Sequence, residues 1–306
     1  MQNQTTSRRF AISLWRHLIQ PSILCRLLTT GGLLLAAAFP ALAAPNPAAD
    51  AEAARIIAAT GVQGGFIVNL GAGDVQLTAA LRRSDSYQVQ GLDRDAAKVP
   101  SDREWLLAEK LHGQVTVDVW RPGPLPYVDN LVNLLVADSL DGISHEDLLR
   151  VLTPNGVAYY KENGEWQKLV KPRPTNIDEW THYFYDARGN VASKDMVVAP
   201  PEGYQWIGSP RWSRHHDRMS SLSAEVSSGG RLFYIMDQGS RISILLPAHW
   251  VITARDAFNG TILWTNEIPH WQSHLWPLKS GPTQLARRLV ADGDHIYTTL
   301  SIDDSV

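Results

Sequence analysis

Two glycines and two aspartates occur in an order that suits the binding of a nucleoside ligand. Gly71 and Gly73 directly follow the apolar run 66–70, and Asp74 comes next. Glycines between a strand and a helix let backbone amides approach a ligand, and an acid about 20 residues later can bind ribose hydroxyls. Asp93 stands 22 positions after Gly71. We therefore expect a ligand-binding loop here, with Asp93 as its ribose ligand.

Helices and strands alternate over residues 51–170, and these elements must position the loop. The expected strands are 66–70, 87–92, 115–119, 131–137 and 157–160, and the expected helices are 52–60, 77–83, 95–110 and 145–152. The run 131–137 is apolar throughout, as is typical of a strand buried on both faces of a parallel sheet. The alternation predicts an α/β doubly wound, Rossmann-like fold.

The stretch 56–160 resembles the class I methyltransferases that use S-adenosylmethionine. Besides the glycine loop, residues 125–136 are similar to the "LPF-DN-FD-V" segment of that family, and 146–156 to its "E-RVLKPGG" segment. The resemblance implies a methyltransferase fold with S-adenosylmethionine as cofactor. It also implies these roles: the methionine end bound by Gly71, Gly73 and Asp74, the ribose by Asp93 and the adenine edge by Asp118.

Two positions depart from that family pattern. Asn69 stands where the family usually has an acid, and Val75 where it usually has a third glycine. We expect the domain to be an accessory that binds the cofactor weakly or is inactive. An active methyltransferase is the alternative, and a non-enzymatic scaffold is the second, because an exported protein would lack S-adenosylmethionine made in the cytoplasm. The chain shows no strand–turn–helix nucleophile elbow, so we assign no catalytic residue.

A second pattern, Ala-x-Asp-x-x-Asn-Gly-x-x-x-Trp, covers residues 254–264. Asn259 and Gly260 both tolerate positive φ, so they predict a tight hairpin turn. The flanking positions alternate with polar residues as half-buried strands do: Ile252, Ala254, Ile262 and Trp264. The pattern resembles the repeat of the PQQ-type β-propellers, in which Trp264 would dock between blades. An ordinary hairpin of another β fold is the alternative.

Residues 178–306 are expected to be the start of such a propeller. Strands expected at 230–236 and 293–299 begin 63 residues apart, whereas a blade takes about 40–50 residues, so 269–282 is interpreted as an insertion. The stretch 178–190 resembles the segment that leads into the first blade. Propellers close with about 4–8 blades, so missing blades or a protein partner should complete this one. The resemblance implies ligand binding or redox chemistry, with pyrroloquinoline quinone as the cofactor of the complete propeller.

The N-terminus is predicted to be a signal peptide covering residues 1–43. Residues 1–49 contain no Asp or Glu, 33–39 form a short apolar core, and Ala41-Leu42-Ala43 has the small-x-small form of a cleavage site. The apolar core is too short for a membrane span, so no stable span is expected after cleavage. We expect an exported protein of the periplasm or cell envelope. An organelle transit peptide and an uncleaved anchor are the alternatives.

Composition is that of a globular protein. The chain is 44% hydrophobic with a net charge of −3, which indicates neither disorder nor a nucleic-acid partner. Cys25 is the single cysteine, so the mature chain has no thiol ligand. No metal site is expected, because adjacent strand residues such as His215 and His216 point to opposite faces. The other candidate histidines are His249, His270 and His274. Proline at 172 and 174 stiffens a linker at 171–177.

Overall fold

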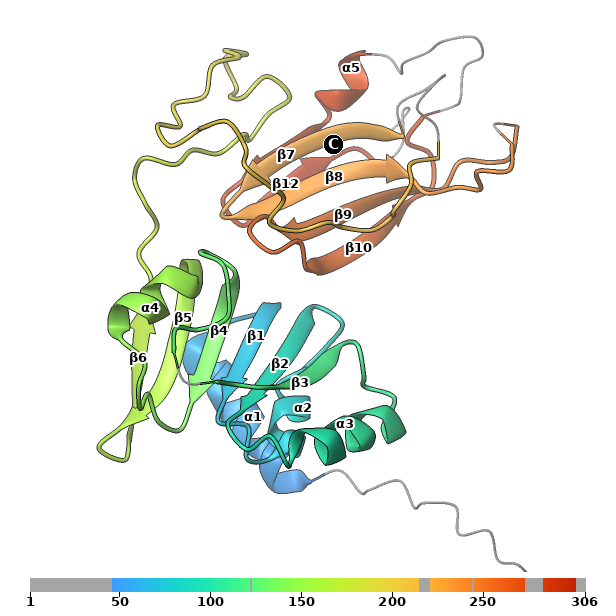
Figure 1. Ribbon diagram of the computed structural model, residues 1–306. Helices are drawn as coiled ribbons and strands as arrows, with labels where there is room; N and C mark the ends of the chain where they lie inside the picture. Colours follow the sequence, from blue (N-terminus) through green and yellow to red (C-terminus); the bar gives the residue numbers. More distant parts are fainter. Residues whose placement is uncertain (1–45, 122, 215–220, 244, 273–282, 301–306) are drawn as a thin grey trace, which may run out of the picture. The chain divides into compact units, whose positions relative to one another are not determined.

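The structure, a computed structural model, describes residues 46–121, 123–214, 221–243, 245–272 and 283–300 (Figure 1). The predicted signal peptide lies outside these ranges. Among the described helices, none is long and apolar enough to cross a membrane. Residues 47–170 form an α/β region and residues 222–298 an antiparallel β region.

The α/β region is built on a single sheet. Its elements in chain order are α1 (Pro47–Thr60), β1 (Gly65–Leu70), α2 (Val75–Ala80), β2 (Tyr87–Asp93), α3 (Val99–Ala108), β3 (Val115–Val119), β4 (Val132–Ala137), α4 (His145–Val151), β5 (Leu152–Glu162) and β6 (Glu165–Val170). The strand order is β3-β2-β1-β4-β5-β6, with β1 to β5 parallel and β6 antiparallel to β5. This confirms the predicted doubly wound, Rossmann-like fold. The order reverses between β1 and β4, and ligands of such sheets bind at the carboxyl ends of the strands at that point.

Both faces of the sheet carry an apolar core. One core lies toward α1, α2 and α3 and includes Ile56, Ile67, Val89, Leu106 and Val136. The other lies toward α4 and includes Val68, Leu92, Leu135 and Leu148; Figure 1 shows α3 beside β3 and α4 beside β5. Ile67 and Val68 are neighbours, are both fully buried and belong to different cores. Strand β1 is therefore held from both sides, which fixes the start of the glycine loop.

Local hydrogen bonds explain where the helices begin. The Asp74 side chain caps α2 by accepting from the Gln76 N–H, and Ser144 caps α4 by accepting from the Asp147 N–H. The helix predicted at 95–110 begins only at Val99, because the Asp93 and Asp95 side chains accept backbone N–H groups two residues ahead and hold a turn there.

A hairpin closes the α/β sheet. Asn163 and Gly164 have φ of 53° and 82°, and positive φ at both central residues is what a two-residue hairpin turn requires. The strand predicted at 157–160 is longer in the structure, since β5 starts at Leu152. Lys171 still exchanges backbone hydrogen bonds with Asn155 and Gly156, so the sheet pairing extends one residue into the segment predicted as a linker.

The β region contains a four-stranded meander and a separate two-stranded hairpin. The meander has the order β10-β9-β8-β7 and the hairpin pairs β11 with β12. The elements are β7 (Leu222–Ser228), β8 (Arg231–Asp237), β9 (Trp250–Asp256), β10 (Ile262–Ile268), α5 (Thr283–Ala286), β11 (Leu289–Asp292) and β12 (His295–Thr298). The expected strands at 230–236 and 293–299 correspond to β8 and β12.

The structure corrects the prediction of half-buried strands around the 254–264 pattern. Every residue of β9 is buried, the polar Thr253 and Arg255 included. Strand β9 lies inside the sheet, between β8 and β10. The Arg255 guanidinium donates hydrogen bonds to the Tyr234 hydroxyl and to the carbonyl oxygens of Gly260 and Ser209. Burial of a polar side chain at this position therefore depends on specific acceptors.

The hairpin turn between β9 and β10 also differs from the prediction. It spans 256–261, with Gly260 at φ 74° as its residue of positive φ, and Asn259 does not share that conformation. The Asp256 carboxylate accepts the N–H groups of Phe258 and Asn259 and so shapes the longer turn. A Cβ on Gly260 would lie 2.4 Å from the Trp206 ring. Gly260 is thus required twice, for its φ and for the close approach of Trp206.

The lead-in segment, residues 178–190, packs along the open edge of β7. The Ser227 N–H donates to the Trp180 carbonyl, and the Ala291 N–H of β11 donates to the Thr181 carbonyl. Tyr183 packs against the apolar core of the β region. The segment therefore connects β7 to β11, and Tyr183 contributes to the packing.

Asp178 anchors this lead-in segment. Its carboxylate accepts hydrogen bonds from the Tyr185 hydroxyl at 2.7 Å and from the Lys194 N–H at 2.6 Å. These hydrogen bonds lower the pKa of Asp178 to about 2. The unfolded value is about 3.9, so the carboxylate stabilises the fold above about pH 4, and this contribution is lost as the pH falls toward 2.

We expect Asp178→Asn to lower the free energy of unfolding of the β region by about 1–2 kcal/mol at pH 7. The loss should shrink to a few tenths below about pH 2, because Asp178 is then mostly protonated in the unmodified protein too. Denaturant titrations followed by tryptophan fluorescence at several pH values measure this difference. Glu202→Gln, at an exposed position, is the matched control. An equal loss at all pH values would show that the Asp178 charge contributes nothing.

A buried ion pair fixes the connection between β8 and β9. Arg214 and Asp237 lie 2.8 Å apart, and their side chains are 1% and 0% exposed. Arg214 also donates to the carbonyl oxygens of Ser240 and Leu246. Burial acts to raise the pKa of Asp237, but hydrogen bonds from the His249 and Gly239 N–H groups and the Arg214 charge hold it below its usual range.

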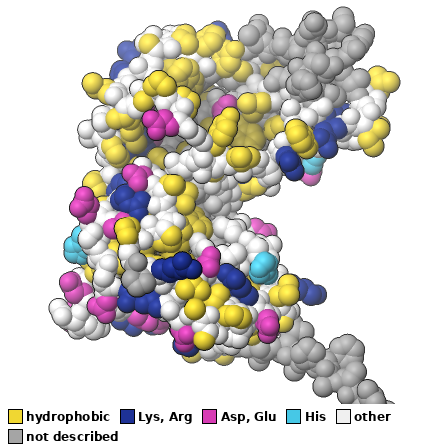
Figure 2. All heavy atoms as spheres, in the orientation of Figure 1, with side chains coloured by type: hydrophobic (Ala, Val, Ile, Leu, Met, Phe, Trp, Pro, Cys, Tyr) yellow, Lys and Arg dark blue, Asp and Glu magenta, His cyan; other side chains and the backbone are white. Residues whose placement is uncertain are grey.

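Hydrophobic side chains are exposed over the β region. Figure 2 shows hydrophobic patches on the face in view. Several large side chains in residues 191–246 are at least half exposed: Met196, Val198, Tyr204, Ile207, Trp212, Ile242 and Leu245. Contiguous exposed apolar surface is typical of interaction sites.

Candidate functional site

The glycine loop begins where β1 ends. Gly71 has φ of 70°, and a Cβ there would meet no atom within 4 Å, so the loop leaves open space beside it. The N–H groups of Gly71 and Ala72 both donate to the Leu92 carbonyl, and the Gly73 N–H donates to the Gly71 carbonyl. The loop amides are therefore used within the backbone. This differs from the expected approach of free amides to a ligand, and it leaves no cradle of N–H groups for a pyrophosphate.

Asp93 is the most distinctive residue of the predicted site. It ends β2 and is 6% exposed. Its Oδ1 accepts from the Asp95 N–H at 2.8 Å, but its Oδ2 is buried and has no hydrogen-bond partner among the described residues. Buried carboxylate oxygens are almost always hydrogen-bonded. Asp93 Oδ2 is therefore a buried acceptor that no described residue uses.

The loop and two acids gather near Asp93. Asp74 follows the loop, and burial raises the pKa of Asp102, with further increases from the carboxylates of Asp93 and Asp74. Asp102 lies in the first turn of α3, and sequence reasoning did not single it out. The signal that could have found it is an acid at the start of the helix that follows β2. The carboxylates of Asp74, Asp93 and Asp102 thus lie near enough to influence one another, and they form an acidic cluster.

Asp118 lies apart from the acidic cluster. Its register partner on β2 is Leu92, whereas Asp93 pairs with Val119, and successive side chains of a strand point to opposite faces. The Asp118 carboxylate is 58% exposed and accepts from Arg103 at 3.0 Å. The structure therefore ties Asp118 to α3 and to solvent.

The two departures from the family pattern have structural roles here. The Asn69 side chain is buried and its amide donates to the Thr78 hydroxyl at 2.9 Å, so it clips α2 onto β1. Val75 is the first residue of α2 and packs against the core under α1 to α3. The Val75 side chain therefore helps to pack α2 against the sheet.

A cavity of about 210 Å³ adjoins Asn69 at the carboxyl ends of β1, β4 and β5. Both charge signs line it, since Lys161 pairs with Asp138 at 2.7 Å and Glu52 pairs with Arg55. Lys161 also lies 4.8 Å above the Trp166 ring. Such a cavity can hold a small group that carries an ammonium and a carboxylate together.

The candidate histidines of the β region form no metal centre in the part of the chain that the structure describes. His249 Nε2 lies 3.0 Å from a Glu267 carboxylate oxygen at an exposed position, and His270 is exposed. Three of the candidates lie outside the described residues: His215, His216 and His274.

No protein-family model matches this chain, and no curated protein matches it. Solved structures similar to it include a putative S-adenosyl-L-methionine-dependent methyltransferase from Methanococcus maripaludis, at 20% identity, with 37% of this chain and 55% of that chain covered and a TM-score of 0.34. A putative sarcosine dimethylglycine methyltransferase from Galdieria sulphuraria matches at 22% identity over 37% of this chain and 46% of that chain, with a TM-score of 0.32.

A third similar structure is geranyl diphosphate C-methyltransferase from Streptomyces coelicolor A3(2), solved with Mg²⁺, geranyl diphosphate and S-adenosyl-L-homocysteine. It matches at 19% identity over 36% of this chain and 44% of that chain, with a TM-score of 0.33. The chain spans about half the length of the solved structures that it matches.

Proposed function

We propose that residues 51–170 form an S-adenosylmethionine-binding domain of the methyltransferase type, with Asp93 as its ribose ligand. The observation that carries the proposal is the buried Oδ2 of Asp93, which has no partner among the described residues. A ribose hydroxyl would donate a hydrogen bond to this oxygen. A buried polar atom without a hydrogen bond costs about 1–3 kcal/mol of free energy, and more when the group is charged, so the ligand would remove this cost.

Charge near Asp93 favours this cofactor over a dinucleotide. S-adenosylmethionine carries a sulfonium and an ammonium, whereas a dinucleotide carries a pyrophosphate. Burial raises the pKa of Asp102, and the nearby carboxylates of Asp93 and Asp74 raise it further while Lys98 lowers it. A cluster of carboxylates attracts cations and repels a pyrophosphate, and the N–H groups of Gly71, Ala72 and Gly73 already donate within the backbone.

The cavity beside Asn69 suits the amino-acid end of the same cofactor. It offers the cations of Arg55 and Lys161 for a carboxylate and the carboxylates of Glu52 and Asp138 for an ammonium. Asn69 lies two residues before Gly71, so the cavity and the glycine loop adjoin. This arrangement supports a cofactor-binding domain over a scaffold that binds nothing.

Calorimetric titration of the full chain with S-adenosylmethionine tests the proposal. We expect binding, no binding of NAD, and a loss of affinity of about 10–100-fold in Asp93→Asn, because a hydrogen bond to a charged group contributes about 1.5–3 kcal/mol. Asp95→Asn, an exposed neighbour, should change the affinity less than about twofold. Absence of S-adenosylmethionine binding in the unmodified chain, or binding that Asp93→Asn leaves intact, would contradict the proposal.

We further propose that residues 178–306 are the first part of a PQQ-like propeller on an exported protein whose signal peptide is 1–43. The support is the repetition of one turn. Gly229 and Gly230 join β7 to β8, Gly293 joins β11 to β12, and Arg231 donates to the Gly293 carbonyl at 2.9 Å. Consecutive equivalent hairpins in contact are what neighbouring blades require.

In this proposal the exposed apolar side chains of the β region, such as Val198 and Ile207, would contact further blades or a protein partner. Pyrroloquinoline quinone is the candidate ligand of the complete propeller, and the methyltransferase-type domain would be carried with it to the periplasm or cell envelope.

A further inference from the structure

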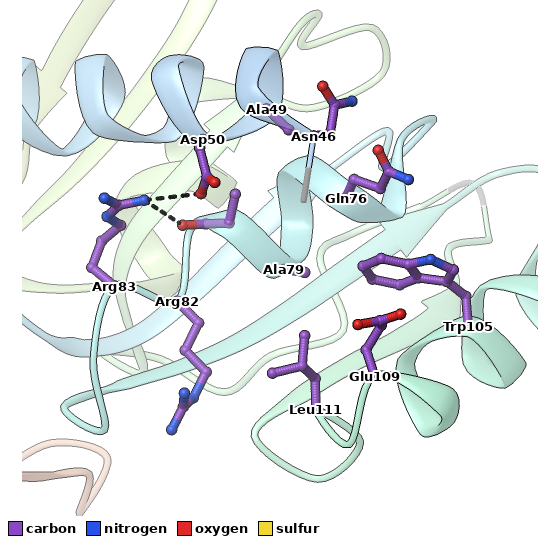
Figure 3. Close-up of a pocket in the computed structure, with 11 residues that line it drawn as sticks. Asn46, Ala49, Asp50, Gln76, Ala79, Arg82, Arg83, Trp105, Glu109 and Leu111 are labelled. Carbon is purple, nitrogen blue, oxygen red and sulfur yellow. Dashed lines mark hydrogen bonds and ion pairs between the residues drawn. The ribbon is translucent and has the colours of Figure 1, made fainter. Parts of the chain in front are cut away.

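Two features lie outside the proposed cofactor site: a pocket and an exposed loop. The pocket, of about 370 Å³, lies among α1, α2 and α3, and Figure 3 shows Asp50 and Arg83 in it. These two side chains lie 3.4 Å apart, and Arg82 pairs with Asp85. The charged groups named here are therefore held by neighbours within the chain. The loop between β8 and β9 differs in this respect.

This loop presents large apolar side chains to solvent. Ile242 and Leu245 are each 90% exposed, and Leu246 is 40% exposed. Together with Arg241 they form a group that we call the tip. Figure 1 shows the loop extending beyond the end of the meander. Apolar side chains gathered at an exposed position are typical of an interaction site.

The exposed conformation of the tip is held by hydrogen bonds. Arg214, which is buried, donates to three carbonyl oxygens of the loop: those of Ser240, Ser243 and Leu246. The hydroxyls of Ser240 and Ser243 each accept the backbone N–H two residues ahead. The loop therefore cannot turn its apolar side chains inward without losing these hydrogen bonds.

The charge around the tip is positive. The stretches 203–214 and 238–248 contain no Asp or Glu. Arg211 and Arg241 are both exposed, and neither is paired with a carboxylate in the part of the chain that the structure describes. The Arg211 guanidinium lies 5.4 Å from the ring of Trp212, which is 60% exposed. Arg214 connects this segment to the tip.

A small apolar projection with cations beside it suits a lipid surface better than a protein surface. A stable protein interface takes about 800 Å² from each partner and excludes charge from its centre. Insertion into a bilayer needs only that a few apolar side chains reach the boundary between headgroups and acyl chains, while arginines attract anionic lipids.

We propose that the tip docks on the surface of an anionic lipid bilayer. Ile242 and Leu245 would enter the boundary between headgroups and acyl chains, and Arg211 and Arg241 would bind lipid phosphates. Trp212 would lie at headgroup level, where tryptophan is enriched. The proposal does not depend on the binding of S-adenosylmethionine or of a quinone.

A fluorescent label at the tip of the full chain tests this. Because residues 33–39 are themselves apolar, the label must report on the tip alone. Cys25→Ser removes the single native thiol, and Leu245→Cys then accepts a polarity-sensitive nitrobenzoxadiazole label. Vesicles of phosphatidylglycerol and phosphatidylcholine in equal parts should shift its emission to the blue, and vesicles of phosphatidylcholine alone should do so much less. The same label on Val198→Cys, an exposed position of another loop, should not respond.

Variants of the labelled chain separate the apolar contribution from the charge. Ile242→Ser should raise the lipid concentration for half of the response about tenfold, and Arg241→Gln about fivefold. Added salt should act in the same direction as Arg241→Gln. Val198→Ser and Lys194→Gln, at exposed positions, are the matched controls and should change it less than about twofold.

Four results would overturn the proposal. They are no response of the label at position 245, an equal response at position 198, equal responses to the two kinds of vesicle, and a response that neither tip variant weakens. Sedimentation without vesicles adds a fifth: a dimer of the unmodified chain that Ile242→Ser dissociates would show that a second copy covers the tip.

Discussion

Arg214→Met is expected to destabilise the β region by about 3–5 kcal/mol, because it removes a buried cation from beside a carboxylate that stays buried. Asp237 would remain 0% exposed, held by the Gly239 and His249 N–H groups but without the guanidinium. The carbonyl oxygens of Ser240 and Leu246 would lose a donor as well. Denaturant unfolding followed by tryptophan fluorescence measures the loss.

The same variant should respond to pH in a defined direction. Burial acts to raise the pKa of Asp237, and the Arg214 charge is one of the causes that hold it low, so loss of Arg214 should raise this pKa relative to the unmodified protein. Stability of the variant relative to the unmodified protein should then improve as the pH falls. Arg211→Met, at an exposed position three residues away, should cost less than about 0.5 kcal/mol. A similar cost for the two variants would show that the buried pair does not stabilise the fold.

Gly260→Ala is expected to cost about 3–4 kcal/mol, from two separate causes. The residue has φ of 74°, and a left-handed conformation costs an L-residue about 1–2 kcal/mol. The new Cβ would also lie 2.4 Å from the Trp206 ring, and overpacking of this kind costs about 1–3 kcal/mol. Thermal or denaturant unfolding of the β region measures the sum.

A matched glycine separates the two causes. Gly293 has φ of 55° in the turn between β11 and β12, and a Cβ there would meet nothing within 4 Å. Gly293→Ala should therefore show only the backbone cost, about 1–2 kcal/mol. Combining Gly260→Ala with Trp206→Ala should recover part of the loss, as a double-mutant cycle would show. Equal costs at the two glycines would mean that Trp206 gives way and that the close approach has no energetic consequence.

Short-range patterns predicted the α/β region well, because its elements are defined by neighbours in the sequence. The strands expected at 66–70 and 115–119 correspond to β1 and β3. Boundaries were less predictable where side chains bind the backbone, as at Asp93 and Asp95 before α3.

Long-range partners set the features of the β region that sequence patterns missed. Strand β7 contains three serines and a glutamate, and only Ala224, Val226 and Ser228 are buried, so the strand depends on its pairing with β8. Full burial of Arg255 depends on Ser209 and Tyr234, which are distant in the sequence. Periodicity alone therefore predicted a half-buried β9.

The candidate site was predictable only in part. Strand-to-helix spacing identified Gly71 and Asp93, since both follow strand ends. The role of Asp102 and the charged cavity beside Asn69 depend on how α3, α1 and β5 pack. The offset of Asp118 follows from the register of β2 with β3, which no local pattern specifies.

The hydrogen bond from Ala291 to the Thr181 carbonyl has a consequence for the order of folding. It joins residues more than a hundred positions apart, and contacts of high sequence separation form late because loop closure must be completed first. During synthesis the meander of β7 to β10 leaves the ribosome before β11 does. Until β11 has been synthesised, the lead-in segment can pair only with the β7 edge. A chaperone that shields this edge would act in that interval.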